Sequence, residues 1–137
     1  MIRVKRVYDP RAHDDGRRVL VERLWPRGVT KQALGADEWM KDVAPSTELR
    51  KWFAHDVARW DEFQRRYRAE LDDNASAWEP LVRASADGDV TLLYSAHDTA
   101  HNGAVVLCDY LRSKERRAPR SSARTRTTKA SARSTSG

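Results

Sequence analysis

The sequence predicts an α/β fold, a small single-domain sandwich with a mostly parallel central sheet and flanking helices. Residues 19–21 and 90–95 are apolar without alternation, which is typical of strands covered on both faces. Segments with helical periodicity follow such strands, and this succession builds layered α/β folds. A chain of 137 residues is long enough for one such domain with its own core.

Three short apolar segments predict strands in the first third of the chain, over residues 1–8, 17–25 and 38–44. Polar turns separate the segments, and the turn before the second strand ends in Gly16. A loop with one helical turn is expected between the second strand and the third.

Two helices are expected next. Ser46 is the predicted N-cap of a short helix that ends at Phe53, and Asp56 is the predicted N-cap of a longer helix that ends near Asp73. Spacings of three and four residues place an apolar stripe along the longer helix. The stripe contains Val57, Trp60, Phe63, Tyr67 and Leu71.

The last third of the chain predicts helix, strand and helix. Residues 75–87 have helical character, and Pro80 within them indicates a kink or a late start. Residues 90–95 form the clearest buried strand. Asp98 or Thr99 is expected to cap the final helix. That helix should direct four side chains inward: Ala104, Val105, Cys108 and Leu111.

The net charge is unevenly distributed along the chain. Residues 113–137 carry eight cations and one acid, a net charge of +7, whereas the whole chain carries +6, so residues 1–112 sum to −1. We therefore predict a near-neutral domain over residues 1–112 and a disordered basic tail over residues 113–137. The basic isoelectric point describes the tail and does not indicate a nucleic-acid-binding domain.

Composition excludes several other classes. Cys108 is the single cysteine, which excludes an intrachain disulfide and fits a reducing compartment. No stretch approaches the roughly 18 apolar residues of a membrane-spanning helix, and the N-terminus lacks the apolar core of a signal peptide. A cytoplasmic protein without membrane contact is expected.

The segment "ERLWPRG" follows the second predicted strand, and open α/β sheets bind ligands beyond the carboxyl ends of their strands. Arg23 and Arg27 bracket a turn and would form a fork around a phosphate or carboxylate, with Trp25 as a stacking surface. In the alternative interpretation, Trp25 belongs to the core, Arg23 pairs with an acid such as Asp42, and Arg27 faces solvent.

The segment "YSAHDTAHN" leads from the last strand into a helix N-terminus, whose unpaired N–H groups attract anions. Tyr94 would stack a ring, Ser95 and Asn102 would donate hydrogen bonds, and His101 would move a proton. In the alternative interpretation, Asp98 only caps the helix and the histidine faces solvent.

The segment "APSTELRKWFAHD" adds three candidate residues. Ser46 would orient the ligand, Arg50 would reach its charge, and His55 would act as a general base. Alternatively, Ser46 only caps a helix and His55 only joins two helices. The histidine spacing does not predict a metal site, no nucleophile elbow supports a catalytic triad, and Cys108 is expected to be inert core. The cofactor is unknown.

The basic tail supports a second hypothesis, a sequence-independent contact with DNA or RNA that weakens as salt is added. The cations concerned are Arg116, Arg117, Arg120, Arg124, Arg126, Lys129 and Arg133. In the alternative interpretation, the tail is a solvated extension that keeps the protein soluble.

Three long motifs, "RVYDPR…DDGRRVLVERLWPRGVTK", "W…DVAPSTELRKWFAHD" and "TLLYSAHD", resemble the YeaO-like branch of the uncharacterised bacterial DUF488 family. The resemblance covers residues 3–112 and implies a compact α/β domain, but it implies no activity. Two residues depart from the family pattern. Glu22 precedes Arg23 where an aspartate is usual, and His97 stands where a lysine is common.

The sequence therefore favours a small-molecule enzyme or ligand-binding domain with a site for an anionic ligand. The alternatives are a nucleic-acid-associated protein anchored by its tail and a non-catalytic, stress-related scaffold. The reaction, the strand order and the oligomeric state stay open.

Overall fold

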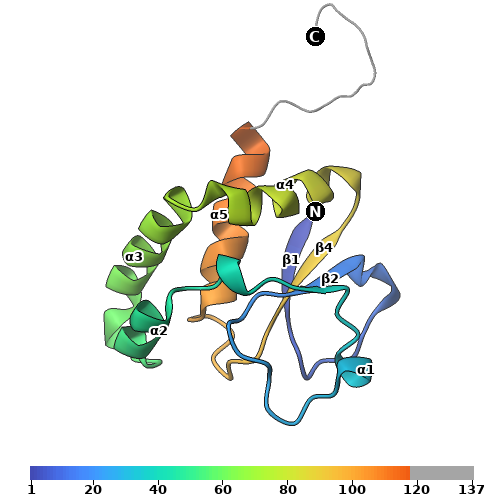
Figure 1. Cartoon of the computed structure of the whole chain (residues 1–137), viewed down its shortest axis with the longest axis horizontal. Helices are drawn as coiled ribbons and strands as arrows, with labels where there is room; N and C mark the ends of the chain where they lie inside the picture. Colours follow the sequence, from blue (N-terminus) through green and yellow to red (C-terminus); the bar gives the residue numbers. More distant parts are fainter. Residues whose placement is uncertain (118–137) are drawn as a thin grey trace, which may run out of the picture.

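A computed structural model describes residues 1–117 of the chain. Its four strands form one sheet in the order β1-β4-β2-β3, and all three strand pairs are parallel (Figure 1). This architecture confirms the predicted α/β class with a mostly parallel sheet. The strands are β1 (Ile2–Arg6), β2 (Arg17–Leu20), β3 (Glu38–Trp39) and β4 (Val90–Tyr94).

Strand β4 lies inside the sheet, between β1 and β2, and all five of its residues are buried. This burial explains its continuous apolar sequence, because each face of the strand meets a hydrophobic layer. Leu92 belongs to the larger hydrophobic cluster and Leu93 to a smaller, second cluster. The residue-by-residue alternation of a strand sends these two neighbours to opposite faces.

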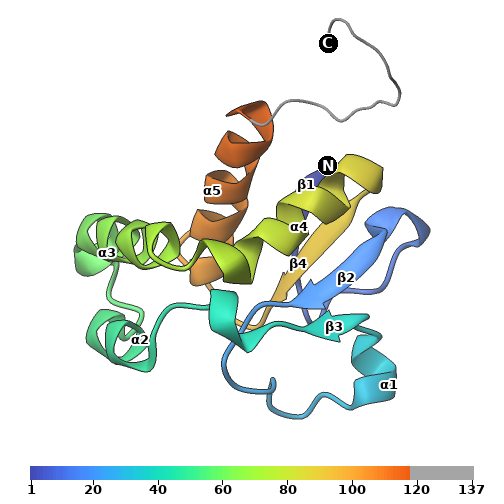
Figure 2. The same cartoon turned by 45° about the horizontal axis from the view of Figure 1, so that its top comes forward.

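Helices cover one face of the sheet (Figure 2). They are α2 (Thr47–Phe53), α3 (Trp60–Asp72), α4 (Ala75–Asp87) and α5 (Gly103–Arg117). The larger cluster joins the inner sides of these helices to one face of the strands. Phe63, Tyr67 and Leu71 supply the buried stripe of α3, as the sequence predicts. Pro80 lies within α4, whose bounds match the prediction.

A thinner layer covers the second face of the sheet. It contains the short helix α1 (Lys31–Leu34) and the loops on either side of it. Leu34 packs with Leu20 and Leu93 in the smaller cluster, against the partly buried rings of Trp25 and Trp39. The single helical turn predicted between the second and third strands is this α1.

Three details differ from the predicted elements. Strand β2 ends at Leu20, whereas the predicted strand continues to Trp25. The Val21 N–H still donates to the Leu93 carbonyl of β4 at 3.2 Å, and the carbonyl of Glu22 then accepts from the Trp39 indole at 2.6 Å. The third strand is two residues long and runs into a 3-10 turn, η2 (Lys41–Val43). Asp56 caps another 3-10 turn, η3 (Val57–Arg59), which places Val57 off the apolar stripe with 53% of its surface exposed.

The cap and the end of the last helix also differ from the prediction. Helix α5 begins at Gly103, and its cap is Asn102, whose side-chain oxygen accepts from the Val105 N–H at 3.0 Å. Asp98 instead accepts from the N–H groups of Ala100 and His101 in the preceding turn. The helix continues to Arg117, past the predicted domain boundary at residue 112. The predictions for residues 118–137 lie outside the described residues.

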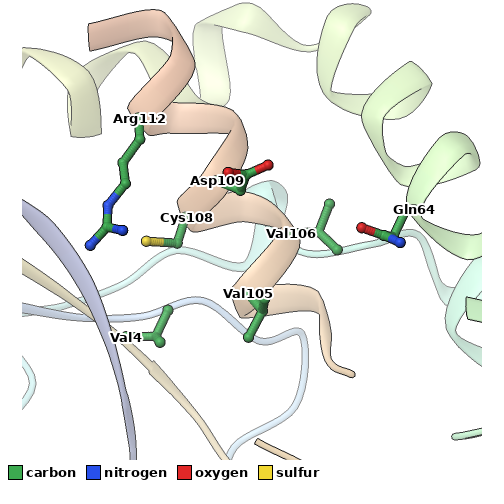
Figure 3. A pocket seen from close by; sticks show the side chains of 7 residues that line it. All are labelled: Val4, Gln64, Val105, Val106, Cys108, Asp109 and Arg112. Carbon is green, nitrogen blue, oxygen red and sulfur yellow. The ribbon is translucent and has the colours of Figure 1, made fainter. Parts of the chain in front are cut away.

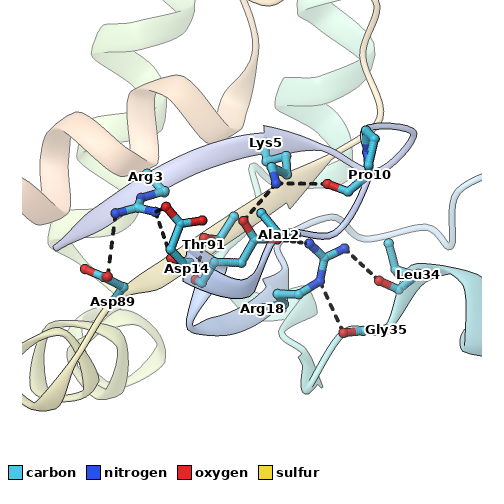
Figure 4. Close-up of polar contacts among 11 residues, drawn as sticks. Arg3, Lys5, Pro10, Ala12, Asp14, Arg18, Leu34, Gly35, Asp89 and Thr91 are labelled. Carbon is cyan, nitrogen blue, oxygen red and sulfur yellow. Dashed lines mark hydrogen bonds and ion pairs between the residues drawn. The ribbon is translucent and has the colours of Figure 1, made fainter.

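A buried ionic cluster joins the edge of the sheet to the loops of the thinner layer (Figure 4). Asp15 and Arg18 are 2% and 4% exposed and form an ion pair, and the Lys5 ammonium lies 2.8 Å from the same carboxylate. Arg18 also donates to the carbonyls of Leu34 and Gly35 at 2.7 and 3.3 Å. The cluster therefore ties β1, β2 and α1 together.

Candidate functional site

The carboxyl ends of β2 and β4 are neighbours in the sheet, and the chain leaves them toward opposite faces. After β2 the chain enters the thinner layer that contains α1, and after β4 it enters α5 on the helical face. Such a topological switch point is the place where open α/β sheets bind ligands. The first polar side chains beyond these two ends are Glu22 and Ser95.

The Glu22 carboxylate bridges the switch point. It accepts the Ser95 hydroxyl at 2.7 Å through one oxygen and the Ser95 backbone N–H at 3.1 Å through the other. The sequence predicts that Ser95 donates hydrogen bonds to a ligand. In the structure, its hydroxyl and its N–H donate to a carboxylate of the chain itself. Glu22 is not among the site residues predicted from the sequence, although an acid directly after a buried strand was a signal that could have identified it.

Arg23 connects the end of β2 to the segment before α2. Its guanidinium donates to the carbonyl of Pro45 at 2.8 Å and to that of Ala44 at 3.3 Å. Gly103, the first residue of α5, packs on the same proline, because a Cβ at Gly103 would lie 3.1 Å from the Pro45 ring. Arg23 and the N-terminus of α5 therefore both contact Pro45.

Ser46 repeats the arrangement of Ser95 with a second carboxylate. Its hydroxyl donates to Glu70 at 2.5 Å and its N–H donates to the other Glu70 oxygen at 2.9 Å. The same hydroxyl oxygen accepts from the Leu49 N–H at 3.1 Å, which is the N-cap bond of α2. Nearby, burial raises the pKa of the Tyr67 hydroxyl above its usual range, so this group stays protonated as a donor to the Val43 carbonyl.

His101 is held at the entrance to α5. Its Nδ1 lies 2.9 Å from an Asp98 oxygen, and its ring meets the Trp60 ring edge-on at 5.0 Å. The N–H of Ala100 and the contact with His101 lower the pKa of Asp98, which keeps that carboxylate ionised. Asn102 is buried and donates to the Asp98 carbonyl at 2.9 Å. Asp98 therefore fixes both predicted site residues of this turn.

Other predicted site residues lie apart from the switch point or within the core. Tyr94 is buried in the main cluster, and burial raises the pKa of its hydroxyl. The Trp25 indole donates to the Val29 carbonyl at 2.5 Å, and its ring contacts Trp39 edge-on at 5.3 Å. Arg27 is exposed in the following turn, where its carbonyl accepts from a tyrosine at 3.2 Å.

Arg50 and His55 lie on the outer side of the α2 region, and both are exposed. His55 and the residue before it have positive φ angles, in the turn that follows α2. The rings of His55, Phe53, Trp60 and His101 form a row with successive centroid distances of 6.3, 5.8 and 5.0 Å. The two predicted catalytic histidines therefore stand at opposite ends of an aromatic row.

A cavity of about 300 Å³ lies elsewhere, between β1, α3 and α5 (Figure 3). Its walls contain none of the predicted site residues of the switch point. They are Val4, Gln64, Val105, Val106, Cys108, Asp109 and Arg112. Burial raises the pKa of the Cys108 thiol, which disfavours the reactive thiolate.

Within residues 1–117, no three histidine, cysteine, aspartate or glutamate side chains gather in a way that could hold a metal ion. Over the same residues, the helices lack the length and apolar character needed to cross a membrane.

A family model and individual relatives place the chain in the same protein family. A family model described as the inactive DUF488-N3 subclade matches residues 1–130, a longer stretch than the resemblance seen in the motifs. The uncharacterized protein YeaO of Escherichia coli (strain K12) is 48% identical over 112 residues, which cover 82% of this chain and 97% of the relative. No solved structure matches the chain.

Two mycobacterial relatives agree with this result. The uncharacterized proteins Mb3100c of Mycobacterium bovis and Rv3073c of Mycobacterium tuberculosis are each 44% identical over 110 residues. These matches cover 80% of this chain and 92% of each relative. The chain therefore belongs to the DUF488 family, in its YeaO-like branch.

Proposed function

We propose that this DUF488 domain binds a small anionic ligand, a carboxylate or a phosphate, at the switch point between β2 and β4, and that it does not turn the ligand over. The observation that carries the proposal is the pair of Ser95 donors. Its N–H and its hydroxyl both bond one carboxylate, that of Glu22, beyond the end of a buried strand. Converging N–H and O–H donors of this kind recognise carboxylate and phosphate oxygens.

Positive charge next to the switch point supports an anionic ligand. Arg23 directly follows Glu22 and is anchored by Pro45, against which the first residue of α5 also packs. A helix N-terminus and a guanidinium both favour negative charge. His101 adds a side chain whose Nδ1 is held by Asp98, which leaves Nε2 as the nitrogen that can meet a ligand.

The family comparison supports binding without turnover, because the matching family model is described as inactive. The predicted catalytic residues His101 and His55 stand at opposite ends of an aromatic row, and a binding function does not require them to act together. The single cysteine is buried, which agrees with a cytoplasmic protein that needs no disulfide.

The test is thermal unfolding of the full chain with acetate, inorganic phosphate, sugar phosphates and nucleoside monophosphates at constant ionic strength. An anion at about 100 times its dissociation constant should stabilise the protein by about 2.7 kcal/mol, which raises the midpoint by several degrees. The shift should disappear in Ser95→Ala. It should persist in Ser76→Ala, which changes an exposed serine of α4.

A shift that survives in Ser95→Ala would place the anion elsewhere. If no anion raises the unfolding midpoint of wild type or of any variant, the proposed function is wrong.

A second candidate function rests on charge: residues 113–137 carry a net charge of +7. We propose a sequence-independent contact of this tail with DNA or RNA. A chain that ends at Arg117 lacks five cations, so the slope of log K against log salt should become shallower by about 4.5 when all five touch phosphates of a DNA duplex. Fluorescence anisotropy with a labelled duplex measures this slope. A shortened chain with an unchanged slope contradicts the proposal.

A further inference from the structure

We infer that Glu22 is an internal competitor at the anion site, which an external anion has to displace from Ser95 before it can bind. The inference rests on the proposed function and adds its regulation: the resting domain is closed by its own carboxylate. The physical basis is that one group of the chain already has the charge, the shape and the hydrogen bonds that the ligand would need.

The Glu22 backbone is anchored while its side chain can turn away. The Glu22 carbonyl accepts from the Trp39 indole at 2.6 Å, and the Trp39 ring is itself covered by the Lys41 ammonium at 4.2 Å. The residue lies beyond the end of β2, outside regular secondary structure, and its side chain is half-buried. Rotation about the side-chain bonds of Glu22 can therefore release the carboxylate to water without moving the strand.

Comparison of the two serine–carboxylate pairs shows why Glu22 is the displaceable one. The Ser46 hydroxyl oxygen also accepts the N-cap bond of α2 from Leu49, so that pair is part of a helix start. Glu70 stands within α3, where the helix backbone fixes its position. Within residues 1–117, the Ser95 hydroxyl and N–H bond to the Glu22 carboxylate only.

The Glu22–Ser95 hydrogen bonds should lower the apparent affinity of the site for an external anion. When the competent state of a site is a minor fraction of the molecules, the apparent dissociation constant rises by the inverse of that fraction. Two hydrogen bonds to a carboxylate are strong enough to keep Glu22 in place for most of the time. We therefore expect Glu22→Ala to bind acetate and phosphate at least about tenfold more tightly than wild type.

The experiment uses the full chain and acetate as the probe, because acetate replaces the –CH₂–COO⁻ group that Glu22→Ala removes. Calorimetry and thermal unfolding with sodium acetate, against sodium chloride at equal ionic strength, should show tighter binding and a rescued midpoint in Glu22→Ala. The rescue should be absent in Glu22→Ala/Ser95→Ala. The matched control Glu79→Ala, which removes an exposed carboxylate of α4, should change neither the midpoint nor the affinity for acetate.

The outcomes separate the two proposals. Tighter acetate binding by Glu22→Ala, lost with Ser95, supports the inference. Equal binding by wild type and Glu22→Ala, or weaker binding by the variant, overturns it and leaves the proposed function intact. No anion binding by either protein overturns the proposed function itself. Should Glu22→Ala fail to fold, Glu22→Gln keeps the side-chain volume and removes the charge, and it must then bind phosphate more tightly than wild type.

Discussion

Replacement of Asp15 by alanine is expected to lower the free energy of unfolding at pH 7 by about 3 to 5 kcal/mol, because it leaves a buried charge without its partner. Arg18 is 4% exposed and pairs with the Asp15 carboxylate, and the Lys5 ammonium lies 2.8 Å from it. Chemical denaturation in urea measures the loss.

Asp14 provides a matched control for this substitution. Its side chain is 78% exposed, and its only described ion pair, with Arg3, has an N–O distance of 3.9 Å. Exposed pairs of this kind contribute about 0 to 1 kcal/mol. A loss in Asp15→Ala no larger than that in Asp14→Ala would mean that the buried cluster does not stabilise the fold.

The same cluster predicts how stability depends on pH. Burial by itself raises the pKa of the Asp15 carboxyl, but hydrogen bonds from Lys5, from the Ala12 N–H and from Arg18 outweigh it and lower the pKa from 3.8 to about 2. The stabilisation from ionised Asp15 is therefore complete above about pH 4 and is lost as the pH falls through about 2. This pH-dependent stabilisation is on the order of 2 kcal/mol. Below about pH 4, the difference in free energy of unfolding between wild type and Asp15→Ala should therefore become smaller, which urea denaturation at several pH values measures.

Gly16→Ala is expected to destabilise the protein by roughly 3 kcal/mol or more. Gly16 has φ 65° and ψ −135°, a conformation that side chains strongly disfavour. A Cβ at this position would also lie 2.2 Å from the backbone carbonyl oxygen of Asp89, which the end of α4 and the start of β4 hold in place. Thermal unfolding should show a midpoint lowered by roughly 10 °C or more.

Gly28→Ala separates backbone strain from the steric clash. Gly28 also has a positive φ, of 75°, but a Cβ there would meet nothing within 4 Å. Only the cost of the left-handed conformation applies, about 1 to 2 kcal/mol. Equal losses in the two variants would show that the contact with Asp89 relaxes, and that Gly16 is required for its φ angle alone.

Local patterns in the sequence were sufficient for much of the secondary structure. The apolar run of β4, the Ser46 cap of α2 and the stripe of Phe63, Tyr67 and Leu71 on α3 all depend on residues within a few positions of one another. Where the prediction was wrong, a distant or competing group decided. Beyond the short second strand, the Glu22 carbonyl accepts from the indole of Trp39, and Asn102 caps α5 in place of Asp98.

The sequence by itself determined the α/β class, the bounds of α2 and α4, and the two polar segments that follow the ends of β2 and β4. Only the tertiary structure decided what those segments do there. The Glu22 carboxylate bonds a serine 73 residues away, and the Asp15 carboxylate joins Lys5 of β1 to Arg18 of β2, two strands that are not neighbours in the sheet. The reason is that such pairs depend on the strand order β1-β4-β2-β3. Strand order is set by the packing of whole layers and leaves no periodic signal in any single segment of the chain.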